Sequence, residues 1–122
     1  MPTPPRILCI DDNEDTCFML KTLLGRSDLE AITVPSTEEA LRLIEREKFD
    51  LYIVDLELPV LSGLEFCKEI RKLDAQTPIL IYTGAGYESD RAAGMLCGAN
   101  SYLVKPNVDD IVPTIKRLLG QS

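Results

Sequence analysis

The feature that most constrains this chain is the regular alternation of short apolar runs with segments of helical periodicity. The apolar runs occupy residues 7–10, 31–34, 51–54, 78–82 and 102–104. Between them, apolar residues return every three or four positions, which is the spacing of a helix with one buried face. Short, continuous apolar runs that alternate with helices are typical of parallel strands covered on both faces. The pattern therefore predicts an α/β fold with five strands and five helices.

Helix ends and one weak helix can also be read from the sequence. Asn13 or Asp12 can cap the first helix, and Gly25 can end it. A fourth helix over roughly residues 88–97 is weaker, because Gly94 in its interior costs ~1 kcal/mol relative to alanine. We expect this part of the chain to change shape more easily than the rest.

Composition limits the classes of function. The chain has 122 residues, of which 45% are hydrophobic and 27% charged, and no repeat or linker interrupts it, so we expect a single domain over 1–122. Histidine is absent, which excludes a Ser-His-Asp or Cys-His triad and every zinc site that needs an imidazole ligand. A net charge of −7 disfavours direct nucleic-acid binding, because such binding depends on cationic side chains that neutralise phosphates.

Four cysteines are present, at positions 9, 17, 67 and 97, and no two of them form a CxxC pair. Each lies in or beside an apolar run, so we expect buried, reduced thiols rather than a disulfide or metal framework. No apolar run approaches the ~20 residues that cross a bilayer, and the first residues are too few and too polar for a signal peptide. We therefore expect a cytoplasmic protein without membrane insertion.

Charged or hydroxyl side chains follow four of the predicted strands. Asp11 and Asp12 follow the first strand, Asp55 the third, Thr83 the fourth and Lys105 the fifth. Any one of them could be an ordinary loop residue, but the carboxyl ends of parallel strands meet at one edge, so all five should converge there. Three carboxylates repel one another, and Lys105 supplies only one positive charge. Mg²⁺ prefers oxygen ligands and tolerates one or two carboxylates with waters and a phosphate oxygen, so we predict a magnesium site.

These residues resemble the signature of a known family. Asp11-Asp12, Asp55 within DLELP, Thr83, and Lys105-Pro106 within SYLVKP are similar to the motifs of the receiver domain of two-component response regulators. The resemblance runs from about residue 6 to residue 119, and the motifs stand in the family's order and spacing. It implies a flavodoxin-like three-layer sandwich with the strand order 2-1-3-4-5.

The resemblance also implies a reaction and its metal. Asp55 would be the phospho-acceptor, whose carboxylate attacks the phosphohistidine of a sensor histidine kinase or phosphotransfer protein. Asp12, Asp55 and the backbone carbonyl of Glu57 would bind Mg²⁺ directly, and Asp11 would bind it through water. Phosphoryl transfer depends mainly on positioning and on neutralising oxygen charge, so the receiver needs no histidine of its own.

Further roles follow from the same resemblance. Lys105 would hold a phosphoryl oxygen, and its peptide bond to Pro106 matches one that is usually cis in the family. Thr83 would donate a hydrogen bond to the attached phosphoryl group. Tyr102 matches the family's switch aromatic, whose ring turns into the space that Thr83 leaves when it moves. A plain strand tyrosine with a solvated hydroxyl is the alternative.

Some positions depart from the family pattern or vary within it. Gly84 stands where the family more often has alanine, so we expect a looser loop after Thr83. Glu57 and Ala85 occupy variable positions that influence how fast the acyl phosphate hydrolyses. A carboxylate at position 57 could repel hydroxide or orient a water molecule, and the sequence does not decide between them.

The output surface and the rival functions complete the sequence-based expectations. The weak fourth helix, the fifth strand and the last helix should form the surface that contacts a downstream protein, with Arg91, Met95, Tyr102 and Ile111 as candidates.

A haloacid dehalogenase-type enzyme would need DxDxT after the first strand and a cap, so we expect no turnover enzyme. A scaffold that is never phosphorylated and a flavodoxin-like cofactor binder are weaker alternatives. The sequence is compatible with a stand-alone receiver and with a receiver cut from a longer protein.

Overall fold

A computed structural model of the chain describes residues 3–121, in which strands and helices alternate strictly. The elements are β1 Arg6–Ile10, α1 Glu14–Gly25, β2 Glu30–Val34, α2 Thr37–Arg46, β3 Leu51–Val54, α3 Gly63–Leu73, β4 Ile79–Thr83, α4 Glu88–Leu96, β5 Ser101–Val104 and α5 Ile111–Leu118. Every predicted strand is present, with ends that differ from the prediction by at most one residue. The periodicity of the apolar residues therefore located all five strands and all five helices.

The strands form one parallel sheet in the order β2-β1-β3-β4-β5, which confirms the predicted topology. The register pairs Ile10 of β1 with Val54 of β3, so the residues that follow them, Asp11 and Asp55, leave the sheet side by side. Further along the sheet, Thr83 at the end of β4 pairs with Val104 of β5, the residue before Lys105. Strand register thus brings the polar residues after β1, β3, β4 and β5 to one edge.

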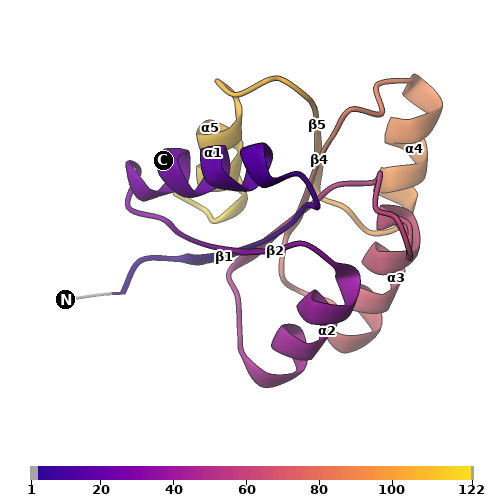
Figure 1. The fold of residues 1–122 in the computed structure, drawn as a ribbon, viewed down its shortest axis with the longest axis horizontal. Coiled ribbons are helices and arrows are strands. Elements are labelled where there is room, and N and C mark those ends of the chain that lie inside the picture. The colour runs from indigo at the N-terminus through magenta and orange to yellow at the C-terminus, as the bar shows by residue number, and fades with distance from the viewer. Residues whose placement is uncertain (1–2, 122) are drawn as a thin grey trace.

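The molecule has three layers, with α2, α3 and α4 on one face of the sheet and α1 and α5 on the other (Figure 1). Alternate strand residues feed the two cores: Leu8 and Ile10 of β1 pack with the three-helix face, and Ile7 and Cys9 pack with the two-helix face. A strand buried on both faces has no polar side, which explains why the sequence shows continuous apolar runs instead of alternation.

Local chemistry at two helix starts positions the loops near the acidic residues. The Asn13 side chain accepts a hydrogen bond of 2.9 Å from the amide of Thr16, so Asn13 caps α1. Gly63 opens α3 against the strand-end loop, where an added Cβ would lie 2.5 Å from the carbonyl oxygen of Asp55. Only glycine permits this approach, which holds α3 directly beneath the loop after β3.

The opposite end of the sheet contains a hydrogen-bonded network centred on Arg71 of α3. Its guanidinium donates to the carbonyl oxygens of Gly98, Asp74 and Thr77 at distances of 2.7–3.2 Å, and to the side-chain oxygen of Asn100 at 3.0 Å. One side chain therefore joins the end of α3, the loop before β4 and the loop between α4 and β5. The sequence analysis did not predict this connection.

Asp74 is a second centre of the same network. Burial works to raise the pKa of Asp74, but hydrogen bonds from the Thr77 hydroxyl, the amides of Thr77 and Gln76, and the Tyr52 hydroxyl outweigh it and hold the pKa at about 2. The Asp74 carboxylate is therefore charged across the physiological pH range and orders the loop before β4.

All four cysteines are free, as predicted. Cys9 and Cys67 are buried, and burial raises the pKa of Cys67 to about 12, which keeps that thiol protonated and inert. Cys17 and Cys97 are only partly buried, so the prediction of full burial was wrong for these two. Within residues 3–121, none of the helices is both long and apolar enough to span a membrane.

Candidate functional site

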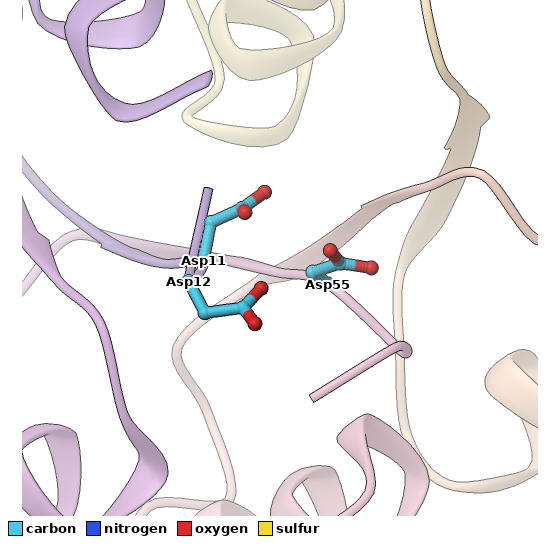
Figure 2. Close-up of side chains that lie close together, drawn as sticks. All are labelled: Asp11, Asp12 and Asp55. Carbon is cyan, nitrogen blue, oxygen red and sulfur yellow. The ribbon is translucent and has the colours of Figure 1, made fainter. Parts of the chain in front are cut away.

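The carboxyl edge of the sheet carries three carboxylates in one cluster. Asp11 and Asp12 leave the end of β1 and extend toward Asp55 at the end of β3 (Figure 2). One oxygen atom from each of the three lies within 4.8 Å of the others. Asp11 and Asp55 are only 3% and 5% exposed, whereas Asp12 faces solvent. The cluster is thus a partly buried set of oxygen ligands with one open side, and it is able to bind a metal ion.

Lys105 enters the same cluster from the end of β5. Its Nζ lies 2.8 Å from Asp11 Oδ2 and 3.1 Å from Asp55 Oδ2, so one ammonium bridges two buried carboxylates. Its peptide bond to Pro106 is cis, as the resemblance implied. Nζ also lies 5.7 Å from the ring centroid of Tyr82, a contact that the sequence analysis did not anticipate. The predicted convergence of Lys105 with the acidic residues is confirmed.

The electrostatics of the cluster favour a further cation. Burial raises the pKa of Asp11 above its ordinary value, and the hydrogen bond from Lys105 offsets this only in part. Burial works to lower the pKa of Lys105, but its hydrogen bonds to Asp11 and Asp55 outweigh that effect and raise the pKa. Lys105 is therefore charged, yet one positive charge faces three carboxylates. A divalent cation would remove the remaining repulsion, and hard oxygen donors suit an ion such as Mg²⁺.

Backbone amides hold the two buried carboxylates in fixed orientations. The amide of Asn13 donates to Asp11 Oδ1 at 2.9 Å, and the amide of Glu57 donates to Asp55 Oδ1 at 3.0 Å. Because Lys105 bonds the other oxygen of Asp55, both oxygens of that carboxylate have protein partners. This arrangement holds the Asp55 carboxylate in one orientation.

The Glu57 side chain lies across the loop that follows β4. A Cβ added to Gly84 would come within 2.8 Å of Glu57 Oε1, so the glycine leaves room for this carboxylate over the loop. Gly84 departs from the family's usual alanine, and an alanine at this position would require only a shift of the exposed Glu57 carboxylate. Glu57 thus bonds Asp55 through its amide, while its exposed side chain lies beside Gly84.

Thr83 and Tyr102 meet through the loop after β4. Thr83 is fully buried, and its hydroxyl accepts a hydrogen bond of 3.3 Å from the amide of Ala85. The Tyr102 hydroxyl donates to the carbonyl oxygen of Ala85 at 2.5 Å, and the ring is only 3% exposed. The Tyr102 hydroxyl is therefore bonded within the protein. The ring occupies an internal position, and the rotation that the resemblance implies stays a prediction.

Four of the predicted site residues form the cluster, and two others are bonded to it through the backbone. Asp11, Asp12, Asp55 and Lys105 form the cluster itself, as the preceding distances establish. Glu57 touches it through its amide, and Thr83 is joined to it through a backbone hydrogen bond of 2.8 Å from the amide of Lys105. The cluster brings together residues from three strands that are up to 94 positions apart in the sequence.

Two residues predicted for the output surface, Ile111 and Tyr102, are buried, and the sequence analysis missed two contacts. Ile111 is completely buried in the core beneath α1 and α5, because it begins the apolar face of α5, so it cannot belong to an exposed output surface. Cys17 donates a hydrogen bond of 3.3 Å to the carbonyl oxygen of Asp11, beside the cluster. Arg91 contacts the Tyr102 ring. No local sequence signal identifies either contact, since both depend on how a helix docks.

Comparison with known proteins agrees with this geometry. The family model of the response regulator receiver domain matches residues 7–116. The alkaline phosphatase synthesis transcriptional regulatory protein PhoP of Bacillus subtilis is 37% identical over 118 residues, which are 96% of this chain and 49% of that protein. The chain thus spans about half the length of the curated relatives that it matches.

Solved structures give the same result. A putative response regulator from Chloroflexus aurantiacus superposes with a TM-score of 0.91 at 35% identity, covering 97% of this chain and 99% of that one. The receiver domain of a sensor histidine kinase from Pseudomonas aeruginosa, solved with a magnesium ion coordinated in its active-site cleft, gives a TM-score of 0.88 at 27% identity, covering 97% and 99%.

A doubly wound parallel sheet with an acidic cluster and a lysine at its carboxyl edge is the arrangement expected of a receiver domain, and the family model matches the chain as one. The chain belongs to the response regulator receiver domain family. It is a phosphorylatable module of two-component signalling, a system in which receiver domains pair with histidine kinases. It is a signalling domain and not a turnover enzyme, so the dehalogenase and cofactor-binding alternatives do not hold.

Proposed function

We propose that Asp55 is the residue that accepts the phosphoryl group. The observation that carries this proposal is the fixed orientation of its buried carboxylate, which lies between the Glu57 amide and the Lys105 ammonium and beside Asp11. A carboxylate oxygen of Asp55 attacks phosphorus, the phosphorus–nitrogen bond of the donor phosphohistidine breaks, and an aspartyl phosphate forms. The donor is a sensor histidine kinase or a phosphotransfer protein, and the acceptor unit is a single domain with its core at about residues 6–119.

The metal of this reaction is proposed to be Mg²⁺. Asp12, Asp55 and the backbone carbonyl of Glu57 would hold it directly, and Asp11 would bind it through water. The position of Asp12 on the solvent side of the cluster and the bond between Lys105 and Asp11 support this division. When bound, the ion neutralises charge on the phosphoryl oxygens. Lys105 would move its hydrogen bond from Asp55 to a phosphoryl oxygen, and Thr83 would donate its hydroxyl hydrogen to another.

Removal of the metal tests the proposed function. We expect acetyl phosphate with Mg²⁺ to add one phosphoryl group per chain, and an excess of EDTA to lower the yield by on the order of tenfold or more, because the three carboxylates then repel the donor. Intact-mass spectrometry measures the adduct, and Mg²⁺ added back in excess is the control.

Equal labelling with and without free Mg²⁺ would show that the metal takes no part. If no adduct forms under either condition, binding of beryllofluoride separates a short-lived acyl phosphate from a domain that is never phosphorylated. A stable beryllofluoride complex would indicate a short lifetime, and no complex would contradict the proposal.

The proposed output surface consists of α4, β5 and the exposed side of α5. Arg91 and Met95 of α4 are exposed, and the buried Tyr102 connects this surface with the loop that follows Thr83. We expect beryllofluoride with Mg²⁺ to change amide hydrogen exchange mainly over residues 84–104, measured by mass spectrometry. Segments of α2, on the same face of the sheet, serve as the internal reference. Unchanged exchange over 84–104 would mean that the output surface lies elsewhere.

A further inference from the structure

The Tyr102 ring is held in its internal position by contacts that come mostly from α4. Its hydroxyl donates to the carbonyl oxygen of Ala85, so one end of the ring is bonded to the loop between β4 and α4. The rest of the ring lies beneath α4, which contacts it through Gly94 and Arg91. The position of the ring therefore depends on where α4 lies, and not only on the space beside Thr83.

Gly94 allows the helix to lie directly against the ring. A Cβ at this position would come within 3.2 Å of Tyr102 Cδ2 and Cε2 and within 2.7 Å of Ile81 Cδ1. Any larger residue would push α4 away from the sheet or displace the ring. The glycine that weakens α4 as an isolated helix is thus the residue that lets α4 cover Tyr102.

Arg91 makes two different contacts with the same tyrosine. The centre of its guanidinium group lies 5.1 Å from the centroid of the Tyr102 ring, in a cation–π arrangement. Its Nη1 also donates to the backbone carbonyl oxygen of Tyr102 at 3.3 Å. A planar guanidinium can stack on a ring while one of its N–H groups donates in the same plane, which a lysine ammonium cannot reproduce. Arg91 is an exposed residue, so replacing it removes no buried apolar side chain.

We infer that Arg91 is a positioning residue of the switch, which keeps the Tyr102 ring inside and thereby holds the loop that follows Thr83. The connection runs from Arg91 to the ring, from the Tyr102 hydroxyl to the Ala85 carbonyl, and from the Ala85 amide to the Thr83 hydroxyl. The inference rests on the proposed function for its consequence at Asp55, but the position of the ring is a property of the unmodified protein.

The ring can be followed directly by ¹⁹F NMR of protein labelled with 3-fluorotyrosine, in which the Tyr102 resonance is assigned from its loss in Tyr102→Phe. The difference in the chemical shift of that resonance between H₂O and D₂O reports how far the ring is exposed to solvent. In the wild type this change should be small, because the residue is 3% exposed. Arg91→Ala should increase it about twofold or more, and Arg91→Lys should fall between the two, since lysine keeps the charge without the planar stack.

Arg46→Ala is the matched control, because it removes another exposed arginine, from α2, and should leave the Tyr102 resonance unchanged. The same variants are then titrated with beryllofluoride in the presence of Mg²⁺. We expect Arg91→Ala to weaken binding about fivefold, as the loss of one partly desolvated cation–π contact implies.

The two parts of this experiment fail in different ways. If the Tyr102 chemical-shift difference between H₂O and D₂O is the same in Arg91→Ala as in the wild type, the inference is overturned, whatever the titration gives. A wild-type protein that binds no beryllofluoride would contradict the proposed phosphorylation of Asp55, and the fluorine measurement would still decide whether Arg91 positions the ring. A larger chemical-shift difference in Arg91→Ala, together with weaker beryllofluoride binding, supports the inference and its link to the site.

Discussion

Replacing Asp55 with asparagine should abolish the phosphoryl adduct while the domain stays folded. The carboxamide that this substitution introduces is a poor nucleophile and, being neutral, a weaker metal ligand than the carboxylate, so the acceptor role of Asp55 is lost and its proposed metal contact is weakened. Its oxygen can still accept a hydrogen bond from the Glu57 amide or from Lys105, and Lys105 keeps its 2.8 Å contact with Asp11. Intact-mass spectrometry after incubation with acetyl phosphate and Mg²⁺ measures the outcome.

The stability of the same variant should change little. Asp55→Asn removes one of three clustered carboxylates, which relieves repulsion, but it also removes one of two partners of Lys105. These effects oppose each other, so we expect the free energy of unfolding to stay within about 1 kcal/mol of the wild-type value in urea.

A matched control distinguishes the acceptor from other acidic residues. Asp28→Asn makes the same chemical change in the loop before β2, at a left-handed position with φ of 60°, which asparagine adopts readily. This variant should be labelled as well as the wild type. Label that persists in Asp55→Asn and maps to another carboxylate in a peptide digest would show that the acceptor is not Asp55.

Replacing Arg71 with methionine should destabilise the domain by about 3 kcal/mol, the largest stability effect expected here. The guanidinium donates to three backbone carbonyls and to the Asn100 side chain, and methionine retains only the apolar stem. Partly buried carbonyl oxygens without donors carry a desolvation cost that exceeds the net worth of each hydrogen bond. Urea denaturation measures the effect as a lower midpoint with little change in slope.

Lys68→Met on the same helix is the control, because it removes an exposed cation from α3 and introduces the same residue. It should change the free energy of unfolding by less than about 0.5 kcal/mol. Equal destabilisation by the two substitutions would mean that the Arg71 network contributes nothing specific. Faster amide exchange at residues 98–100 in Arg71→Met alone would place the loss at the loop between α4 and β5.

Much of the fold could be predicted because strand and helix periodicity are local properties. The run of residues 51–54 is apolar throughout because both faces of β3 are covered, and Asp55 ends it where the chain reaches the sheet edge. The site residues could be predicted for the same reason, since parallel strands must deliver their next residues to one edge. The strand order came from resemblance, because the packing of crossovers leaves no local signal.

Where local sequence and tertiary packing disagree, packing decided the outcome. The spacing of Ile111 with Ile115 and Leu118 places it on the apolar face of α5, and the docking of that face buries it completely, which rules out its assignment to the output surface. Gly94 weakens α4 by its own propensity, yet it is the residue that allows α4 to cover Tyr102. Each outcome depends on a neighbour that lies far away in the sequence.

The sequence by itself therefore determined which elements form and which polar residues end the strands, because hydrophobic periodicity and strand direction need only neighbouring residues. Only the tertiary structure decided which side chains contact one another. It showed that Lys105 bridges Asp11 and Asp55. It also showed that Arg71 joins three segments and that Arg91 covers Tyr102. Such contacts are set to within a few tenths of an ångström by how helices dock on the sheet, and docking is a property of the assembled core.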